Sequence, residues 1–302
     1  MSVTFEIKPQ PKTADAITRL DGTFQTRDGT VLHAHHWRSR RAEQQGGALV
    51  VLMHGYGEHC ERYRELANVL VAQGHPVTGF DARGHGRSPG QRGHIDDYDR
   101  YVADLHQFLL EIKPRYRERP CVLLGHSNGG LTALRAIQTR RPWPDGLILV
   151  SPLIALQRAH RPLPLWAAEV AATFLGRLPL PSGIAATELS HDPAIVEASR
   201  SDPYSHTRTT PRWYVCARRA MEQAITQLDA ITLPVLVVHG ALDPLVDPRA
   251  IERMTALIPS QDKEQLVCRG GFHEVLNETD RDETQRRIAG WISSRFGARA
   301  AA

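Results

Sequence analysis

Short apolar runs alternate with amphipathic segments along most of the chain. From Ala48 onward the runs read ALVVLMHG, HPVTGFD, CVLLGHS, GLILVSP, PVLVVHG and KEQLVCRG. They are separated by segments with helical spacing of apolar residues, near 60–73, 98–115, 128–140, 247–258 and 279–296. Continuous apolar strands that alternate with helices are typical of a mostly parallel sheet covered on both faces. The pattern therefore predicts an α/β fold.

The region before Ala48 follows a different pattern. Residues 1–20 are rich in Pro, Lys and Thr, and we predict a loose lead-in there. The stretch GTFQTRDGTVLHAHHW then shows two alternating runs around Asp28-Gly29, which is typical of a β-hairpin. We expect this antiparallel hairpin to form one edge of the sheet.

Residues 152–232 interrupt the alternation of strands and helices. They contain the unusually apolar LPLWAAEVAATFLGRLPLP and the more polar segments SHDPAIVEASRSDPYSH and WYVCARRAMEQAI. We interpret them as a helical cap inserted over the carboxyl ends of the strands, where ligands bind in open α/β sheets. An ordinary helical layer of the core is the alternative. The core is then expected to comprise residues 1–151 and 233–302.

Composition and charge narrow the class of partner. The chain has 302 residues, of which 41% are hydrophobic and 23% charged, with a formal net charge of +4. Its basic residues are interleaved with acidic ones and form no block of five, so we expect no nucleic-acid partner. The cysteines, Cys60, Cys121, Cys216 and Cys268, lie far apart and form no C-x-x-C motif, which argues against a metal cluster or a redox pair.

The compartment is inferred from the same features. The N-terminal residues show no basic segment followed by an apolar one, and no apolar run reaches 18 residues. Scattered cysteines fit a reducing compartment. We expect a cytoplasmic protein with peripheral contact to a membrane, and the periplasm stays open as an alternative.

The segment PCVLLGHSNGGL carries the first candidate for chemistry. Ser127 follows an apolar strand and precedes NGGLTALRAIQ, a good start for a helix. Gly125 and Gly129 leave room for the tight strand–turn–helix that exposes a nucleophilic serine. A serine hydroxyl needs a base to accept its proton, so a histidine and an acid should follow.

One histidine and one acid fit the chain order that this arrangement requires. His273 lies in VCRGGFHEVLNE, in a Gly-rich loop after the last strand. Asp243 follows the preceding strand in PVLVVHGALDPLVD and is the predicted acid. Asp247 is the rival, but its place before Pro248 is typical of a helix cap. The predicted catalytic residues are therefore Ser127, Asp243 and His273.

A serine hydrolase also needs hydrogen-bond donors for the developing oxyanion. One predicted donor is the backbone N–H of Asn128, at the start of the helix after Ser127. The other is the N–H of Tyr56, in the loop LMHGYGEH after the first parallel strand.

The motifs together resemble those of a known family. HGYGEHCERY, DARGHGRSPGQRG, GHSNGG, HGALDPLVD and FHEVLNE are similar to motifs of the monoacylglycerol lipase and lysophospholipase group of α/β-hydrolases, over about residues 25–155 and 233–295. The resemblance implies an eight-stranded sheet, a helical cap, the same triad and the same oxyanion donors. It also implies that Glu58 and Arg62 lie near the alcohol end of the pocket. Many members have Met where this chain has Asn128, whose backbone alone is needed.

These features predict a serine ester hydrolase that forms an acyl-Ser127 intermediate and needs neither cofactor nor metal. Monoacylglycerol is the expected substrate. A lysophospholipase, a short-chain carboxylesterase, an acyltransferase or perhydrolase with the same triad, and a non-catalytic binding protein are the alternatives.

The apolar part of the cap is the local evidence for a lipid substrate. Two roles are open for its large side chains: lining an acyl channel with an apolar face toward a membrane or micelle, or packing the cap onto the core. The residues concerned are Leu163, Leu165, Trp166, Val170, Phe174 and Leu175.

Other histidines and charged residues have structural interpretations. His54 is expected to hold the oxyanion loop by hydrogen bonds, and His126 either packs beside Ser127 or contacts the leaving group. His33, His35 and His36 lie on an early strand, where we do not expect a metal site. In DARGHGRS, Asp81 and Arg83 are predicted to make internal polar contacts.

Overall fold

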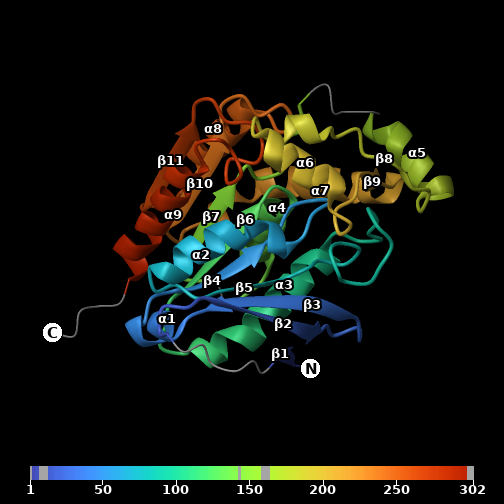
Figure 1. Ribbon diagram of the computed structural model, residues 1–302. Helices are drawn as coiled ribbons and strands as arrows, with labels where there is room; N and C mark the ends of the chain where they lie inside the picture. The colour runs from blue at the N-terminus through green and yellow to red at the C-terminus, as the bar shows by residue number, and fades with distance from the viewer. Residues whose placement is uncertain (1, 7–12, 142–143, 158–163, 298–302) are drawn as a thin grey trace.

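A nine-stranded sheet forms the centre of the molecule in the computed structural model, which describes residues 2–6, 13–141, 144–157 and 164–297 (Figure 1). Its strand order is β1-β2-β3-β5-β4-β6-β7-β10-β11. The strands are β1 (Val3–Phe5), β2 (Thr18–Gln25), β3 (Val31–Arg38), β4 (Leu49–Met53), β5 (Val77–Phe80), β6 (Cys121–His126), β7 (Gly146–Val150), β10 (Val235–Gly240) and β11 (Lys263–Cys268).

The sheet is antiparallel at one edge and parallel over the rest. The pairs β1–β2, β2–β3 and β3–β5 are antiparallel, whereas β5, β4, β6, β7, β10 and β11 pair in parallel. The predicted hairpin around Asp28-Gly29 is thus confirmed as β2–β3, near one edge. The predicted mostly parallel sheet is confirmed as well.

Helices cover both faces of this sheet. The helices that pack on it are α1 (Arg40–Gln45), α2 (Arg64–Ala72), α3 (Asp99–Ile112), α4 (Asn128–Thr139), α8 (Pro248–Leu257) and α9 (Arg281–Phe296). Apolar residues of α1, α2 and α9 pack on one face, and those of α3, α4 and α8 pack on the other. Each face therefore has its own apolar core.

The period of two along each strand explains why the strands read as continuous apolar runs. In β4, Leu49, Val51 and Met53 point into the core beneath α3 and α4, whereas Val50 and Leu52 point into the core beneath α2 and α9. All five side chains are buried. A strand that is buried on both faces is apolar at every position, which explains the continuous apolar runs in the sequence.

The number of strands differs from the expectation of eight. The additional strand is β1, which lies inside the segment predicted as a loose lead-in and pairs with β2. Val3 is fully buried, but three residues are too few to show an alternating pattern. The lead-in is also shorter than predicted, because β2 begins at Thr18.

The segment predicted as a cap is largely helical. It contains α5 (Leu165–Leu175), α6 (Pro193–Ser201), α7 (Pro211–Thr226) and the short antiparallel pair β8 (Leu180–Pro181) and β9 (Arg208–Thr209). These elements gather along one end of the sheet, at the top of Figure 1. Buried residues of α5 and α7 belong to the same apolar core as α3 and α4. Within the described residues, no helix has the length and apolar character needed to cross a bilayer.

Candidate active site

Ser127 sits in a tight turn between β6 and α4. Its backbone has φ of 50° and ψ of −116°, a region that residues other than glycine rarely adopt. Its neighbours have no room for side chains: a Cβ on Gly125 would lie 2.5 Å from the Gly129 oxygen, and one on Gly129 would lie 2.1 Å from the Met53 oxygen. The turn is therefore held in a strained form that turns the serine side chain out of the sheet.

The Ser127 hydroxyl is hydrogen-bonded to a histidine. Ser127 Oγ lies 2.8 Å from His273 Nε2, and His273 Nδ1 lies 2.7 Å from Asp243 Oδ2. A carboxylate only accepts hydrogen bonds, so Nδ1 carries the proton and Nε2 presents its lone pair to the serine. The structure thus brings the three predicted residues into the geometry that base-assisted attack by a serine requires.

Asp243 is held in place by the loop after β10. Its Oδ1 accepts the N–H groups of Leu245, at 2.8 Å, and Val246, at 2.9 Å. Burial raises the pKa of Asp243, but the charge and hydrogen bond of His273 and these two N–H groups outweigh it, so its pKa lies below the ordinary value. Asp243 is accordingly a carboxylate at neutral pH.

The pKa of His273 is shifted in the opposite direction. Burial lowers it, but the charge and hydrogen bond of Asp243, with smaller contributions from Glu274 and Glu58, outweigh burial and raise it above 6.5. The carboxylates thus stabilise the imidazolium form of His273.

The rival acid, Asp247, has the role expected of a helix cap. Its side chain accepts the N–H of Arg249 at 3.0 Å, and Pro248 is the first residue of α8. His273 bonds to Asp243 and not to Asp247.

The two predicted oxyanion donors lie where they were expected, one at the start of a helix and one on a loop. Asn128 is the first residue of α4, where backbone N–H groups have no partner within the helix. Tyr56 follows Gly55, and a Cβ on Gly55 would come within 3.2 Å of the Ser127 Cβ, so this loop lies against the serine. The N–H groups of Tyr56 and Asn128 donate to no acceptor in the described part of the chain. Their role as oxyanion donors stays a prediction.

Charged side chains are buried beside the triad. Glu58 accepts the N–H of Gly55 at 2.6 Å, the hydroxyl of Tyr63 at 2.5 Å and the Nδ1–H of His126 at 3.0 Å. Burial raises the pKa of Glu58, but the hydrogen bond and charge of His126 and the charge of Arg62 outweigh it and lower its pKa below the usual range. Glu58 is therefore a carboxylate that holds the loop of Gly55 and Tyr56 in place.

Arg62 links Glu58 to a second acid that the sequence reasoning missed. Its Nε lies 3.1 Å from Glu58 Oε2, and its NH2 group donates to Glu274 Oε2 at 2.6 Å. Glu274 directly follows His273, and that position after the predicted base was the available signal. A buried arginine between two carboxylates is fixed in orientation and can present polar groups to an alcohol.

A cavity of about 710 Å³ opens above these residues. Ser127, His126 and His273 line it together with Glu58, Arg62 and Glu274. Apolar side chains from the loop after β7, from the loop after Asp243 and from α5 and α7 form other parts of its wall, including Leu153, Leu156, Ala168, Trp213, Ala217, Met221 and Leu245. Charged and apolar surfaces therefore meet around one serine.

Three residues predicted to contact substrate do not line this cavity. Trp166 and Phe174 turn outward, with 71% and 80% of their surface exposed. Leu165 is half-buried and packs against the core. The α5 residues that turn inward are the small ones, Ala168 and Ala172. Leu163 lies outside the described residues.

The structural interpretations of His54, Asp81 and Arg83 agree with the contacts seen. His54 Nδ1 bonds to the Gly55 oxygen at 2.7 Å, and its Nε2 accepts the N–H of Ala82 at 2.9 Å. Arg83 binds Asp104 and Asp28, whereas Asp81 accepts the N–H groups of Cys60 and Arg87. These bonds join the loop after β4 to the loop after β5.

The chain matches known proteins over most of its length. Residues 44–280 match the family described as serine aminopeptidase, S33. Monoglyceride lipase of Rattus norvegicus is 31% identical over 273 residues, which make up 89% of each chain. Monoacylglycerol lipase of Mycolicibacterium smegmatis is 32% identical over 248 residues, 82% of this chain and 88% of its own. The chain belongs to the monoacylglycerol lipase group of the α/β-hydrolases.

A relative with another name and a solved structure support the same placement. Phospholipase YtpA of Bacillus subtilis is 29% identical over 239 residues, 78% of this chain and 91% of its own. The crystal structure of the monoacylglycerol lipase of Paleococcus ferrophilus superposes with a TM-score of 0.76 at 29% identity, covering 87% of this chain and 98% of the other. The resemblance found in the motifs is thus confirmed, and the chain is a serine ester hydrolase.

Proposed function

We propose that the protein hydrolyses monoacylglycerols to a fatty acid and glycerol, with Ser127 as nucleophile, His273 as base and Asp243 as the residue that orients the base. The hydrogen-bonded series from Ser127 Oγ to Asp243 at the floor of a 710 Å³ cavity carries this proposal. A cavity of that size is within the range of small-molecule sites. Relatives named for monoacylglycerol hydrolysis support the choice of substrate.

The reaction follows from the arrangement of these groups. His273 Nε2 takes the proton of Ser127 as the serine oxygen attacks the ester carbonyl, and the N–H groups of Tyr56 and Asn128 stabilise the oxyanion. Collapse breaks the bond to glycerol, whose oxygen takes the proton back from His273. Water, deprotonated by the same histidine, then attacks the acyl-Ser127 ester and releases the fatty acid.

The two kinds of cavity wall suit the two parts of a monoacylglycerol. Glu58, Arg62 and Glu274 offer charged hydrogen-bond partners for glycerol hydroxyls. The apolar wall that includes Ala168 and Met221 suits an acyl chain, because it removes apolar surface from water. A lysophospholipid shares the acyl chain, and the similarity to phospholipase YtpA makes lysophospholipase activity the second candidate.

A comparison of substrates tests this function. We expect kcat/KM for a long-chain monoacylglycerol to exceed that for a lysophospholipid of the same chain length and for a short-chain ester by at least tenfold, which corresponds to about 1.4 kcal/mol. The measurement is fatty-acid release, with Ser127→Ala protein as the blank. A competing alcohol or peroxide in the same assay distinguishes an acyltransferase or perhydrolase from a hydrolase.

Two variants of α5 sharpen that comparison. Ala168→Leu adds bulk to the cavity wall and should lower kcat/KM for the long chain by about tenfold while sparing the short ester. Ala167→Leu is the matched control, because Ala167 does not line the cavity. If the wild-type protein preferred the short ester, it would be a general carboxylesterase. If it preferred the lysophospholipid, it would be a lysophospholipase. Binding of esters without any turnover would overturn all of these hydrolytic functions.

We also propose that α5 contacts a lipid surface. Trp166, Val170 and Phe174 occur at every fourth position and are 71%, 56% and 80% exposed. Leu175, Leu178 and Leu180 extend the same exposed apolar stretch. Side chains on one face of a helix that leave this much apolar surface in water support contact with a membrane or micelle.

Vesicle binding tests the contact. We expect the double variant Trp166→Ser, Phe174→Ser to bind phosphatidylcholine vesicles at least about tenfold more weakly than the wild type, because it removes two exposed apolar side chains that would enter the lipid. Leu257→Ser is the control, since Leu257 on α8 is 66% exposed but lies far along the chain from α5. Equal sedimentation of all three proteins with vesicles would contradict the proposal.

A further inference from the structure

Three side chains with metal-binding atoms meet on the antiparallel part of the sheet, outside the residues of the hydrolytic site. Asp21 lies on β2 directly opposite His35 of β3, and His33 lies two residues before His35. Alternate residues of a strand share a face, so all three point to the same side of the sheet. One ligand atom from each lies within 4.8 Å of the ligand atoms of the other two.

The spacing of these atoms suits a transition-metal ion. Asp21 Oδ1 lies 3.3 Å from His33 Nε2 and 3.6 Å from His35 Nδ1. Ligands that bind zinc tetrahedrally at 2.0–2.1 Å are about 3.3 Å apart, by the geometry of the tetrahedron. An ion between these three atoms therefore needs only small side-chain movements.

His35 supplies an independent reason to expect a cation. Its Nε2 lies 3.2 Å from Asp81 Oδ1, and Asp81 is fully buried. Asp81 Oδ1 also accepts the N–H of Cys60 and its Oδ2 accepts that of Arg87, so both of its oxygens act as acceptors. His35 Nε2 therefore carries a proton and donates it to Asp81.

The other nitrogen of His35 then faces an acceptor. His35 is 1% exposed, and its buried Nδ1 has no hydrogen-bond partner in the described part of the chain. Its lone pair is 3.6 Å from a carboxylate oxygen of Asp21. Two acceptors facing each other in a buried place repel, and a positive ion between them removes the repulsion. A histidine that binds metal through one nitrogen and donates to a carboxylate through the other is a common arrangement.

The surrounding charges leave a net negative site. Arg19 bonds to Asp21 through Oδ2 at 2.9 Å, whereas His33 and His35 lie against Oδ1. Arg87 lies 3.9 Å from Asp21 Oδ1 and 3.6 Å from Glu61. The carboxylates of Asp21, Glu61 and Asp81 thus outnumber the two guanidinium groups by one. Asp21 and His33 are partly exposed, so an ion can enter from solvent.

We propose that Asp21 Oδ1, His33 Nε2 and His35 Nδ1 bind Zn²⁺, with water as the fourth ligand. Two imidazoles and one carboxylate are a donor set that zinc accepts, whereas magnesium and calcium prefer oxygen ligands alone. The site is separate from Ser127 and serves to fasten β2 to β3.

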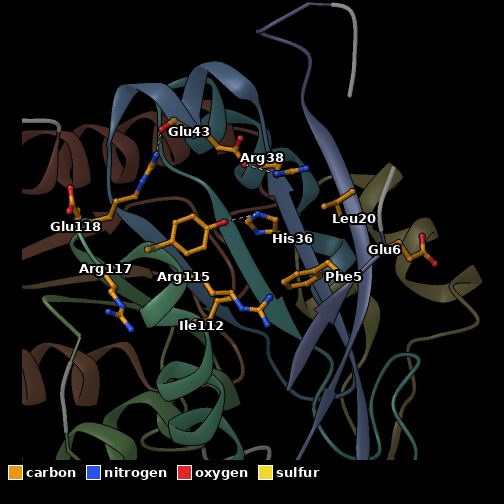
Figure 2. A pocket seen from close by; sticks show the side chains of 12 residues that line it. Phe5, Glu6, Leu20, His36, Arg38, Glu43, Ile112, Arg115, Arg117 and Glu118 are labelled. Atoms are coloured by element: carbon orange, nitrogen blue, oxygen red, sulfur yellow. Dashed lines mark hydrogen bonds and ion pairs between the residues drawn. The ribbon is translucent and has the colours of Figure 1, made fainter. Parts of the chain in front are cut away.

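This proposal revises the expectation drawn from His33, His35 and His36 alone. His36 points to the opposite face, where its Nε2 bonds to the Tyr116 hydroxyl at 2.9 Å in a second cavity (Figure 2). The third proposed ligand is therefore Asp21, on the neighbouring strand β2, and not His36.

Zinc titration of the full chain tests the proposal. After treatment with a chelator, we expect the wild type to bind one Zn²⁺ by calorimetry and to unfold at a higher temperature with zinc than without. Asp21→Asn and His33→Ala should each weaken binding at least about tenfold and abolish the shift in unfolding temperature. Co²⁺ should give the visible absorption of a four-coordinate ion in the wild type but in neither of these two variants.

His106→Gln is the matched control, because His106 lies on α3 and bonds to the Arg141 oxygen. Helix α3 packs on the face of the sheet opposite to that of His33, His35 and Trp37. This variant should bind zinc as the wild type does. Circular dichroism checks that each variant is folded, and Asp21→Asn keeps the size of the side chain if His33→Ala does not fold. No binding by the wild type, or equal binding by the wild type and both site variants, would overturn the proposal.

Discussion

Ser127→Ala should lower kcat for ester hydrolysis by at least about 10⁴-fold. The substitution removes the hydroxyl group whose oxygen lies 2.8 Å from His273 Nε2 and leaves the rest of the side chain unchanged. The oxyanion donors and the cavity remain, so residual hydrolysis by water is expected at a low level and KM should change little. The free energy of unfolding should change by no more than about 1 kcal/mol, because alanine adopts the backbone of Ser127 with similar strain.

Ser201→Ala is the control for this loss. Ser201 lies at the end of α6 and bonds to the Glu197 oxygen of its own helix. The activity of the Ser201→Ala protein should equal that of the wild type in a continuous assay of fatty-acid release. Full activity in folded Ser127→Ala protein would remove Ser127 as the nucleophile.

Asp243→Asn should lower kcat/KM by about 10⁴-fold, the size of effect known for the acid of such triads. The amide is nearly isosteric, but it can donate to His273 Nδ1 and so favours the wrong tautomer. It also removes the negative charge that stabilises the imidazolium. Asp247→Asn is the matched control: asparagine is as good a helix cap as aspartate, so activity and stability should stay close to wild type.

The pH profile gives this variant a second readout. His273 acts as a base only when neutral, and its pKa is raised above 6.5, so wild-type kcat/KM should fall as pH drops through a value above 6.5. In Asp243→Asn, the negative charge that raises the pKa of His273 is lost, whereas the effect of burial, which lowers that pKa, remains. The fall in kcat/KM should therefore move to lower pH. If Asp247→Asn gave the large loss and the shifted profile instead, the assignment of the acid would be wrong.

The sequence predicted the parallel sheet and the elements around Ser127 because those signals are local. Strands such as β4 are apolar on both faces, and the glycines around Ser127 mark its turn within a few residues. The order Ser127, Asp243, His273 follows from the ends of successive strands. Strand β1 was not predicted, because its three residues are too few to show an alternating pattern.

The predictions that differed depend on contacts between distant residues. Helix α5 is apolar almost throughout, so its sequence does not say which face is buried, and the small residues Ala168 and Ala172 face inward while Trp166 and Phe174 face outward. The ion pair of Arg62 with Glu274 joins residues 212 positions apart. The cluster of Asp21 with His35 likewise depends on the register of the hairpin.

Location of the acyl group during turnover tests the central claim most directly. A reaction with a long-chain monoacylglycerol, quenched in acid within the first turnovers, should yield a proteolytic peptide that spans Ser127 and carries the mass of the acyl chain. The same peptide from Asp243→Asn protein should carry it more slowly, and that from Ser127→Ala protein should not carry it at all. An acyl group on another residue, or fatty-acid release by Ser127→Ala protein at the wild-type rate, would contradict the account.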